Sequence, residues 1–173
     1  MIALSELNTL PPAEFASTLA GIFEHSPWVA ERVSAARPFG SRHQLLEAMR
    51  TAVDEATPEE QLALIRAHPK LGLRGRAALT EASAQEQRGA GLDAGLPEEL
   101  ARLEELNAAY ALKFAMPFVL AVRGHTPQSI IAACERRLRN DLPLEQGTAL
   151  REIGLIAGYR LAGVVSEECE TDD

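Results

Sequence analysis

The chain has 173 residues, enough for one domain with an ordinary hydrophobic core. Its formal net charge of −8 argues against nucleic acid or an acidic membrane surface as a partner, because both are bound by clustered positive charge. Cys134 and Cys169 form neither a disulfide framework nor a metal-ligand spacing, and no apolar run has the length of a signal peptide or a membrane span. We therefore expect a soluble, cytoplasmic protein.

Helices are predicted along nearly the whole chain, because alanine and leucine abound and prolines fall where helices would begin. The first helix is expected from Pro11 to about Phe23. Ser26 is expected to cap a short second helix that Pro27 opens, and Ser41 is expected to cap a third.

The segment Thr57-Pro58-Glu59-Glu60 has the pattern of a capping box with proline at the first helical position, which predicts a helix from there to His68. Pro69 ends this helix, because the residue before a proline is pushed out of the helical region. His68 is therefore expected at a helix C-terminus, where the helix dipole favours a protonated imidazole.

Residues 70–96 contain five glycines and show weak periodicity, which predicts a long loop with one short helix near Ser83 to Arg88. Ser83 and Glu86 have the spacing of a second capping box. This purely structural interpretation is compatible with a short helix that presents Gln87 to a cleft.

Strong helical periodicity returns at Pro97 and continues until Pro117 breaks it, with Asn107 interrupting the apolar stripe. Further helices are expected from Thr126 to about Asn140 and from about Leu144 to Val165. Together these elements predict an all-α, single-domain bundle of about seven to nine helices over residues 1–166. The acidic residues 167–173 are expected to form a disordered tail.

Three side chains suggest chemistry. His68 and Glu86 could provide a proton donor and an acceptor, and Arg160, on an apolar stripe, could hold an anionic substrate. Each has a simpler interpretation: His68 as a C-cap, Glu86 as half of a capping box, and Arg160 as a side chain that extends its charged end to solvent. For the first two, the residues alone favour the simpler interpretation.

An ordered set of motifs covers nearly the whole chain, from about Leu7 to Val165, and resembles the family of 2-oxo-4-hydroxy-4-carboxy-5-ureidoimidazoline (OHCU) decarboxylases of urate breakdown. Any one motif is weak, but the ordered set is specific. The matching segments are Glu24-His-Ser-Pro-Trp28, Ala67-His-Pro-Lys-Leu-Gly72, Ser83-Ala-Gln-Glu-Gln87, Gly89-Ala-Gly-Leu-Asp93, Leu106-Asn-Ala-Ala-Tyr110, Lys113-Phe-Ala-Met-Pro-Phe118, Ala121-Val-Arg-Gly124, Ala149-Leu-Arg-Glu-Ile153 and Arg160-Leu161.

The resemblance implies an all-helical, homodimeric decarboxylase that converts OHCU to (S)-allantoin with neither a metal nor an organic cofactor. It implies that His68 and Glu86 are catalytic. The positions that match the family's substrate-binding residues are Pro69, Ser83, Gln87, Phe118, Val119 and Arg160.

The chain departs from the family pattern at three places, one of which is a loop after Gly72 that looks short. Lys70 follows His-Pro where many members have an acidic residue, and Ala115-Met116 stand where many members have Gly-Phe. These changes concern the shape of the pocket and the rate rather than the proposed catalytic groups. The competing interpretation is a non-enzymatic helical adaptor that binds a partner helix in an apolar groove.

Overall fold

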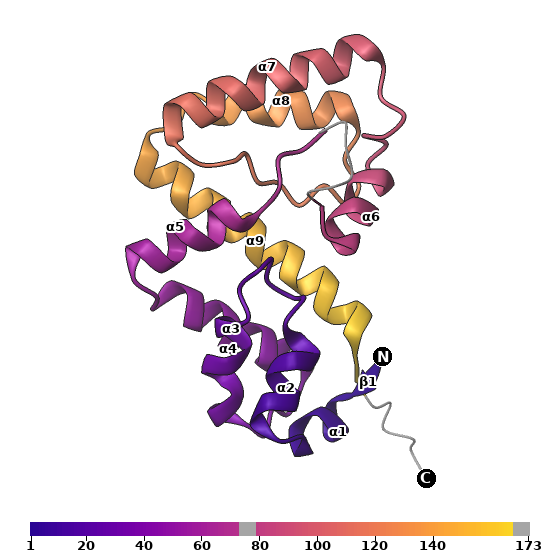
Figure 1. Cartoon of the computed structure of the whole chain (residues 1–173), viewed down its shortest axis with the longest axis vertical. Helices are drawn as coiled ribbons and strands as arrows, with labels where there is room; N and C mark the ends of the chain where they lie inside the picture. The colour runs from indigo at the N-terminus through magenta and orange to yellow at the C-terminus, as the bar shows by residue number, and fades with distance from the viewer. Residues whose placement is uncertain (73–78, 168–173) are drawn as a thin grey trace. The chain divides into compact units, whose positions relative to one another are not determined.

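The structure is a computed structural model that describes residues 1–72 and 79–167, and the proposed acidic tail lies outside the described residues except for Glu167. Within these ranges the chain forms nine α-helices, one short 3-10 helix and a two-stranded sheet (Figure 1). The prediction of an all-α fold with seven to nine helices is confirmed. None of the described helices is both long and apolar enough to cross a membrane.

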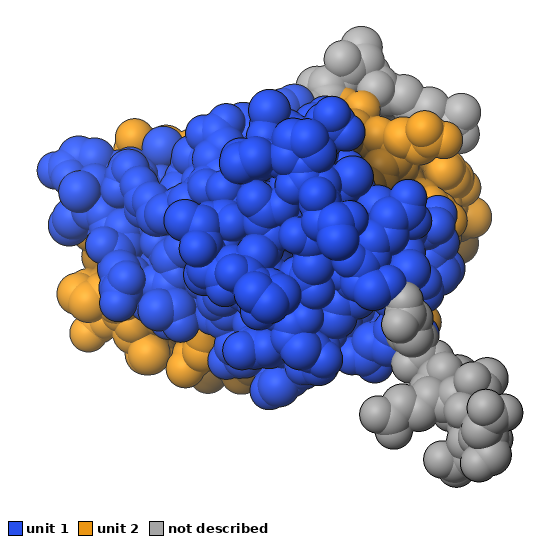
Figure 2. Space-filling view, turned by 90° about the horizontal axis from the view of Figure 1, so that it is seen from below, with its two compact units in different colours: residues 1–64, 154–173 blue, residues 65–153 orange. Residues whose placement is uncertain are grey.

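The chain divides into two compact units, coloured separately in Figure 2. Unit 1 consists of residues 1–64 and the C-terminal part from residue 154, and unit 2 is the uninterrupted segment 65–153. The boundaries fall near the end of α5 (Pro58–Ala67) and in the middle of α9 (Leu142–Val164). Each unit has its own buried apolar side chains.

Unit 1 joins the two ends of the chain. Strand β1 (Ile2–Ala3) pairs in parallel with β2 (Val165–Ser166), with Ile2 opposite Val165. The helices between them are α1 (Leu4–Thr9), α2 (Pro12–Leu19), α3 (Trp28–Val33) and α4 (Arg42–Asp54), with the 3-10 helix η1 (Ser34–Ala36) after α3. Their buried side chains include Leu7, Phe15, Leu19, Leu45 and Met49.

Three details of the N-terminal prediction are wrong. The helix expected from Pro11 to about Phe23 ends earlier, since α2 stops at Leu19. Helix α1 was not predicted, because it is six residues long and its N-cap residue, Ala3, makes no side-chain cap. Ser26 does not cap α3: the N-cap is Pro27, and the Ser26 hydroxyl donates to the Glu24 carbonyl at 3.0 Å. Ser41 does cap α4 as predicted, accepting a hydrogen bond from the backbone N–H of Gln44 at 3.1 Å.

Unit 2 contains α6 (Glu81–Gly89), α7 (Pro97–Phe114) and α8 (Pro127–Arg137), and α7 packs along α8 (Figure 1). Between α7 and α8 the chain runs through a buried segment, residues 116–122, that forms neither helix nor strand. Side chains supply hydrogen bonds to its backbone: Arg137 donates to the Val119 carbonyl at 2.7 Å, and Glu152 accepts from the Ala121 N–H at 2.9 Å.

Candidate active site

His68 is the first residue after α5, as the sequence predicts. The Thr57–Glu60 capping box at the start of α5 is present, with Thr57 N–H donating to the Glu60 carboxylate at 2.9 Å and Glu60 N–H to the Thr57 hydroxyl at 3.2 Å. At the other end, the His68 N–H donates to the Ile65 carbonyl at 3.2 Å. The imidazole is more than a surface cap, because His68 is only 6% exposed.

The loop after His68-Pro69 is held by two amide side chains. Gln87 of α6 accepts from the Gly72 N–H at 3.0 Å and donates to the Lys70 carbonyl at 3.3 Å. Asn107 of α7 donates to the Leu71 carbonyl at 2.8 Å. Both amides are buried. Gln87, predicted to touch substrate, therefore binds the loop that follows the candidate catalytic histidine.

Helix α6 begins earlier than predicted, and the proposed Ser83–Glu86 capping box is wrong. The N-cap residue is Thr80, whose hydroxyl accepts from the Ser83 N–H at 3.3 Å. Ser83 is thus the third residue of α6. It lies one helical turn before Gln87, and both side chains are buried whereas Glu86 is partly exposed. Glu86 is therefore not half of a capping box.

A buried ionic cluster holds the segment that carries Phe118 and Val119. Arg137 donates to Glu145 at 2.7 Å and to the Val119 carbonyl, and its guanidinium lies 4.7 Å from the centre of the Phe118 ring. Tyr110 donates its hydroxyl to Glu145, and burial, followed by this bond, raises the pKa of Tyr110 above its usual range. Arg137 and Glu145 were not predicted, because no local pattern links them to residues 118–119.

Arg160 lies in unit 1 and forms an ion pair with Glu24 at 2.7 Å. The side chains are 7% and 1% exposed, so the alternative in which Arg160 extends to solvent is wrong. Sequence reasoning missed Glu24 as a functional candidate, although it is the first residue of a segment that matches the family. The other predicted site residues, His68, Pro69, Ser83, Glu86, Gln87, Phe118 and Val119, belong to unit 2.

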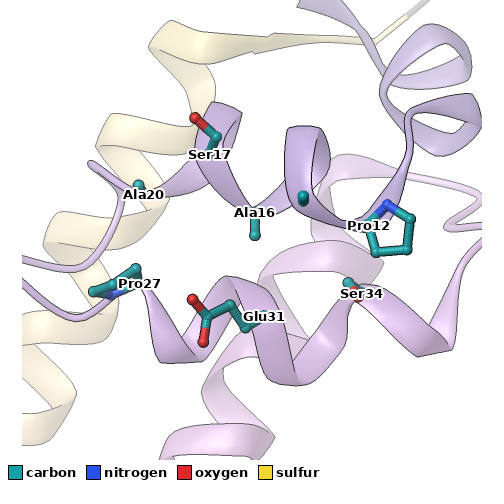
Figure 3. A pocket seen from close by; sticks show the side chains of 8 residues that line it. Pro12, Ala16, Ser17, Ala20, Pro27, Glu31 and Ser34 are labelled. Atoms are coloured by element: carbon teal, nitrogen blue, oxygen red, sulfur yellow. The ribbon is translucent and has the colours of Figure 1, made fainter.

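Each unit also has a pocket. In unit 1, a pocket of about 440 Å³ lies between α2 and α3, lined mainly by small side chains and by Glu31 (Figure 3). It contains no predicted site residue. In unit 2, the lining residues of a pocket of about 600 Å³ are Lys70, Leu71, Gly72, Pro97, Leu100, Ala101, Glu104, Asn107 and Ala108. This pocket too contains none of the predicted site residues. In the described ranges, no three His, Cys, Asp or Glu side chains are grouped as they would be around a metal ion.

Comparison with known proteins identifies the family. A family model described as OHCU decarboxylase matches residues 8–162. The chain belongs to the OHCU decarboxylase family. It is 42% identical over 167 residues to the 2-oxo-4-hydroxy-4-carboxy-5-ureidoimidazoline decarboxylase of Haloferax volcanii, covering 96% of this chain and 98% of that protein.

Two further proteins similar to this OHCU decarboxylase family member are longer than the chain. It is 40% identical over 171 residues to the uric acid degradation bifunctional protein of Bacillus subtilis, covering 99% of this chain but 34% of that protein. Among solved structures, an (S)-allantoin synthase superposes with a TM-score of 0.76 at 32% identity, covering 95% of this chain and 54% of the other.

Proposed function

We propose that this protein decarboxylates OHCU to (S)-allantoin in the breakdown of urate, by a cofactor-free acid/base mechanism. The observation that carries the proposal is the 42% identity to the Haloferax OHCU decarboxylase over almost the full length of both chains. Further support comes from the buried positions of His68, Ser83 and Gln87 in unit 2.

In this proposal, the C–C bond to the substrate carboxylate breaks, carbon dioxide leaves, and the electron pair moves into the C=N and carbonyl groups of the substrate ring. The protein has to orient the carboxylate, stabilise the developing charge and allow a proton to reach only one face of the ring. Protonation on one face yields a single stereoisomer of allantoin.

His68 is the proposed proton-transfer group, because the unperturbed pKa of histidine lies near neutral pH. Glu86 is proposed to bind N–H groups of the substrate and to support the protonated imidazole. Ser83 and Gln87 provide polar contacts, whereas Pro69, Phe118 and Val119 form apolar walls. Arg160, paired with Glu24 in unit 1, is proposed to bind the substrate carboxylate or a ring carbonyl.

Replacing His68 tests this assignment. His68→Asn should lower the rate of OHCU loss, followed by ultraviolet absorbance, by a factor on the order of a hundred or more, because proton transfer is removed. His43→Asn is the matched control: His43 is exposed on α4 and should be dispensable. Glu86→Gln should also depress the rate strongly, because a neutral amide stabilises an imidazolium less than a carboxylate does.

The stereochemistry of the product tests the function as a whole. Circular dichroism of the allantoin formed should show one enantiomer when the wild-type protein is present. Racemic allantoin formed at the uncatalysed rate, with and without the protein, would end the decarboxylase proposal.

We further propose that the protein is a cytoplasmic homodimer. Leu155 and Tyr159 are exposed one turn apart on α9, where a second copy could cover them. Sedimentation equilibrium should find twice the mass of the chain, and a monomer at every concentration would refute the dimer.

A further inference from the structure

Two buried amide side chains bind three consecutive residues immediately after the candidate catalytic dipeptide His68-Pro69. Gln87 bonds the Lys70 carbonyl and the Gly72 N–H, and Asn107 bonds the Leu71 carbonyl that lies between them. We call this pair, Gln87 and Asn107, the amide clamp. The two side chains come from different helices, α6 and α7, so the clamp ties the loop to both.

Packing alone fixes this loop incompletely. On one side Gly72 lies against α7 so closely that an added Cβ would stand 2.6 Å from a methyl group of Leu103, and its φ of +74° favours glycine. Residues 70–72 also border the pocket of about 600 Å³, with Asn107 in its wall. Where side chains do not fill the space behind a loop, directional hydrogen bonds decide where its backbone lies.

Stability alone does not explain an asparagine at position 107. Its Nδ2 is used by the Leu71 carbonyl, but its buried Oδ1 has no hydrogen-bond partner among the described residues. A buried acceptor without a partner has lost its hydrogen bond to water and destabilises the folded state. Leucine has the same number and branching of side-chain heavy atoms and no polar atom, and the neighbouring core positions on this face of α7, Leu103 and Tyr110, are apolar or amphipathic.

We propose that Asn107 is a positioning residue for the decarboxylation, one that acts with Gln87 to fix the Lys70–Gly72 backbone and thereby the direction in which His68 presents its imidazole. This inference rests on the proposed function. It assigns to Asn107 a role through the loop rather than through contact with substrate, and it adds a positioning role to Gln87. A displacement of a catalytic group by about 1 Å can lower a rate on the order of a hundredfold, so a loosened loop has a measurable kinetic effect.

The test is Asn107→Leu, which removes the donor to Leu71 and the unpaired Oδ1 together. We expect the melting temperature to change little, because the variant removes one unpaired buried acceptor, Oδ1, and leaves another, the Leu71 carbonyl. We expect kcat to fall at least about tenfold and KM to change much less, because the substrate contacts remain while the proton-transfer geometry is lost. The control is Leu106→Ala, a buried neighbour on α7 outside the clamp. It should lower the melting temperature and leave kcat unchanged at temperatures where the variant is folded.

Hydrogen exchange supplies a readout that does not depend on activity. In Asn107→Leu the Gly72 N–H, which donates to Gln87, should exchange faster than in the wild type, whereas in Leu106→Ala its exchange should change only as global stability does. Wild-type kcat together with wild-type Gly72 protection in Asn107→Leu would overturn the inference. If the wild-type protein does not consume OHCU, the proposed function fails, and faster Gly72 exchange in the variant would still support the clamp.

Discussion

Glu24 and Arg160 form an ion pair that is buried on both sides, with side-chain exposures of 1% and 7%. Removing one member of such a pair leaves the other charge in a site that water cannot solvate. The pair therefore has a structural role in unit 1 as well as any role in binding substrate. The Glu24 carboxylate also orients the Arg160 guanidinium in advance, so that its N–H groups are already directed when a second anion binds.

At this residue scale we predict that Glu24→Gln lowers the free energy of unfolding by about 3–5 kcal/mol, because Arg160 stays charged without the Glu24 carboxylate beside it. Chemical denaturation measures the change. The matched control is Glu47→Gln, which breaks the exposed Glu47–Arg50 pair and should cost no more than about 1 kcal/mol. Equal effects in the two variants would mean that burial adds nothing to the Glu24–Arg160 pair.

A residue's place in the fold could be predicted when the residues that fix that place are near it in sequence. The place of His68 at the end of α5 follows from Thr57 and Pro69, both within the same segment. Ser83 was assigned the wrong position in its helix because Thr80 and Ser83 are both good N-cap residues, and only the folded chain shows which one begins α6. Partners distant in sequence, such as Glu24 for Arg160, leave no local signal.

At the scale of elements, α7 ends in a residue of unusual conformation. Ala115 follows α7 with a φ of 54°, in the left-handed region, and its carbonyl accepts a hydrogen bond from Arg66 at 3.0 Å. A side chain with a Cβ is strained in this region, and glycine is not. This position is also where the chain has alanine and many members of the resembled family have glycine, so the departure noted in the sequence has a physical cost.

We therefore predict that Ala115→Gly raises the free energy of unfolding by about 0.5–1 kcal/mol, the relief of strain exceeding the added entropy of the unfolded chain. The control is the same chemical change at Ala109, exposed within α7, where glycine should cost about 1 kcal/mol. In thermal unfolding, a rise in stability for Ala115→Gly together with a fall for Ala109→Gly would support strain at Ala115. A loss of stability in both would show that Ala115 is not strained.

Helix starts were predicted better than helix ends, for a reason visible in α8. Its start at Pro127 is fixed by Thr126 and Ser129, which are neighbours in sequence. Its end was expected near Asn140 but comes at Arg137, where the chain turns and Lys113 of α7 donates to the Leu138 and Asn140 carbonyls at 2.7 and 2.8 Å. A side chain from another helix thus replaces the local hydrogen bonds that would have continued the helix.

At the scale of the whole molecule, Cys134 reports on the opening of unit 2. It is fully buried on α8, and burial raises the pKa of its thiol to about 12. Because the thiolate is the reactive form, Cys134 is protected below that pH both by its burial and by the protonation of its thiol. In a Cys169→Ser variant, whose only thiol is Cys134, alkylation at pH 8.5 should be very slow without denaturant and should accelerate with the unfolding transition. Rapid alkylation of the native variant would show that unit 2 opens around α8 without unfolding.

The pairing of β1 with β2 has a consequence for the order in which the protein can fold during synthesis. Unit 2 is continuous in sequence, so all of its residues have been added once the ribosome passes residue 153. Unit 1 is completed later in synthesis, because Ile2 pairs with Val165 and Glu24 pairs with Arg160. Of the two units, the one that contains the earlier residues of this sequence is therefore completed last, and a chain truncated before Arg160 would lack the guanidinium that pairs with Glu24.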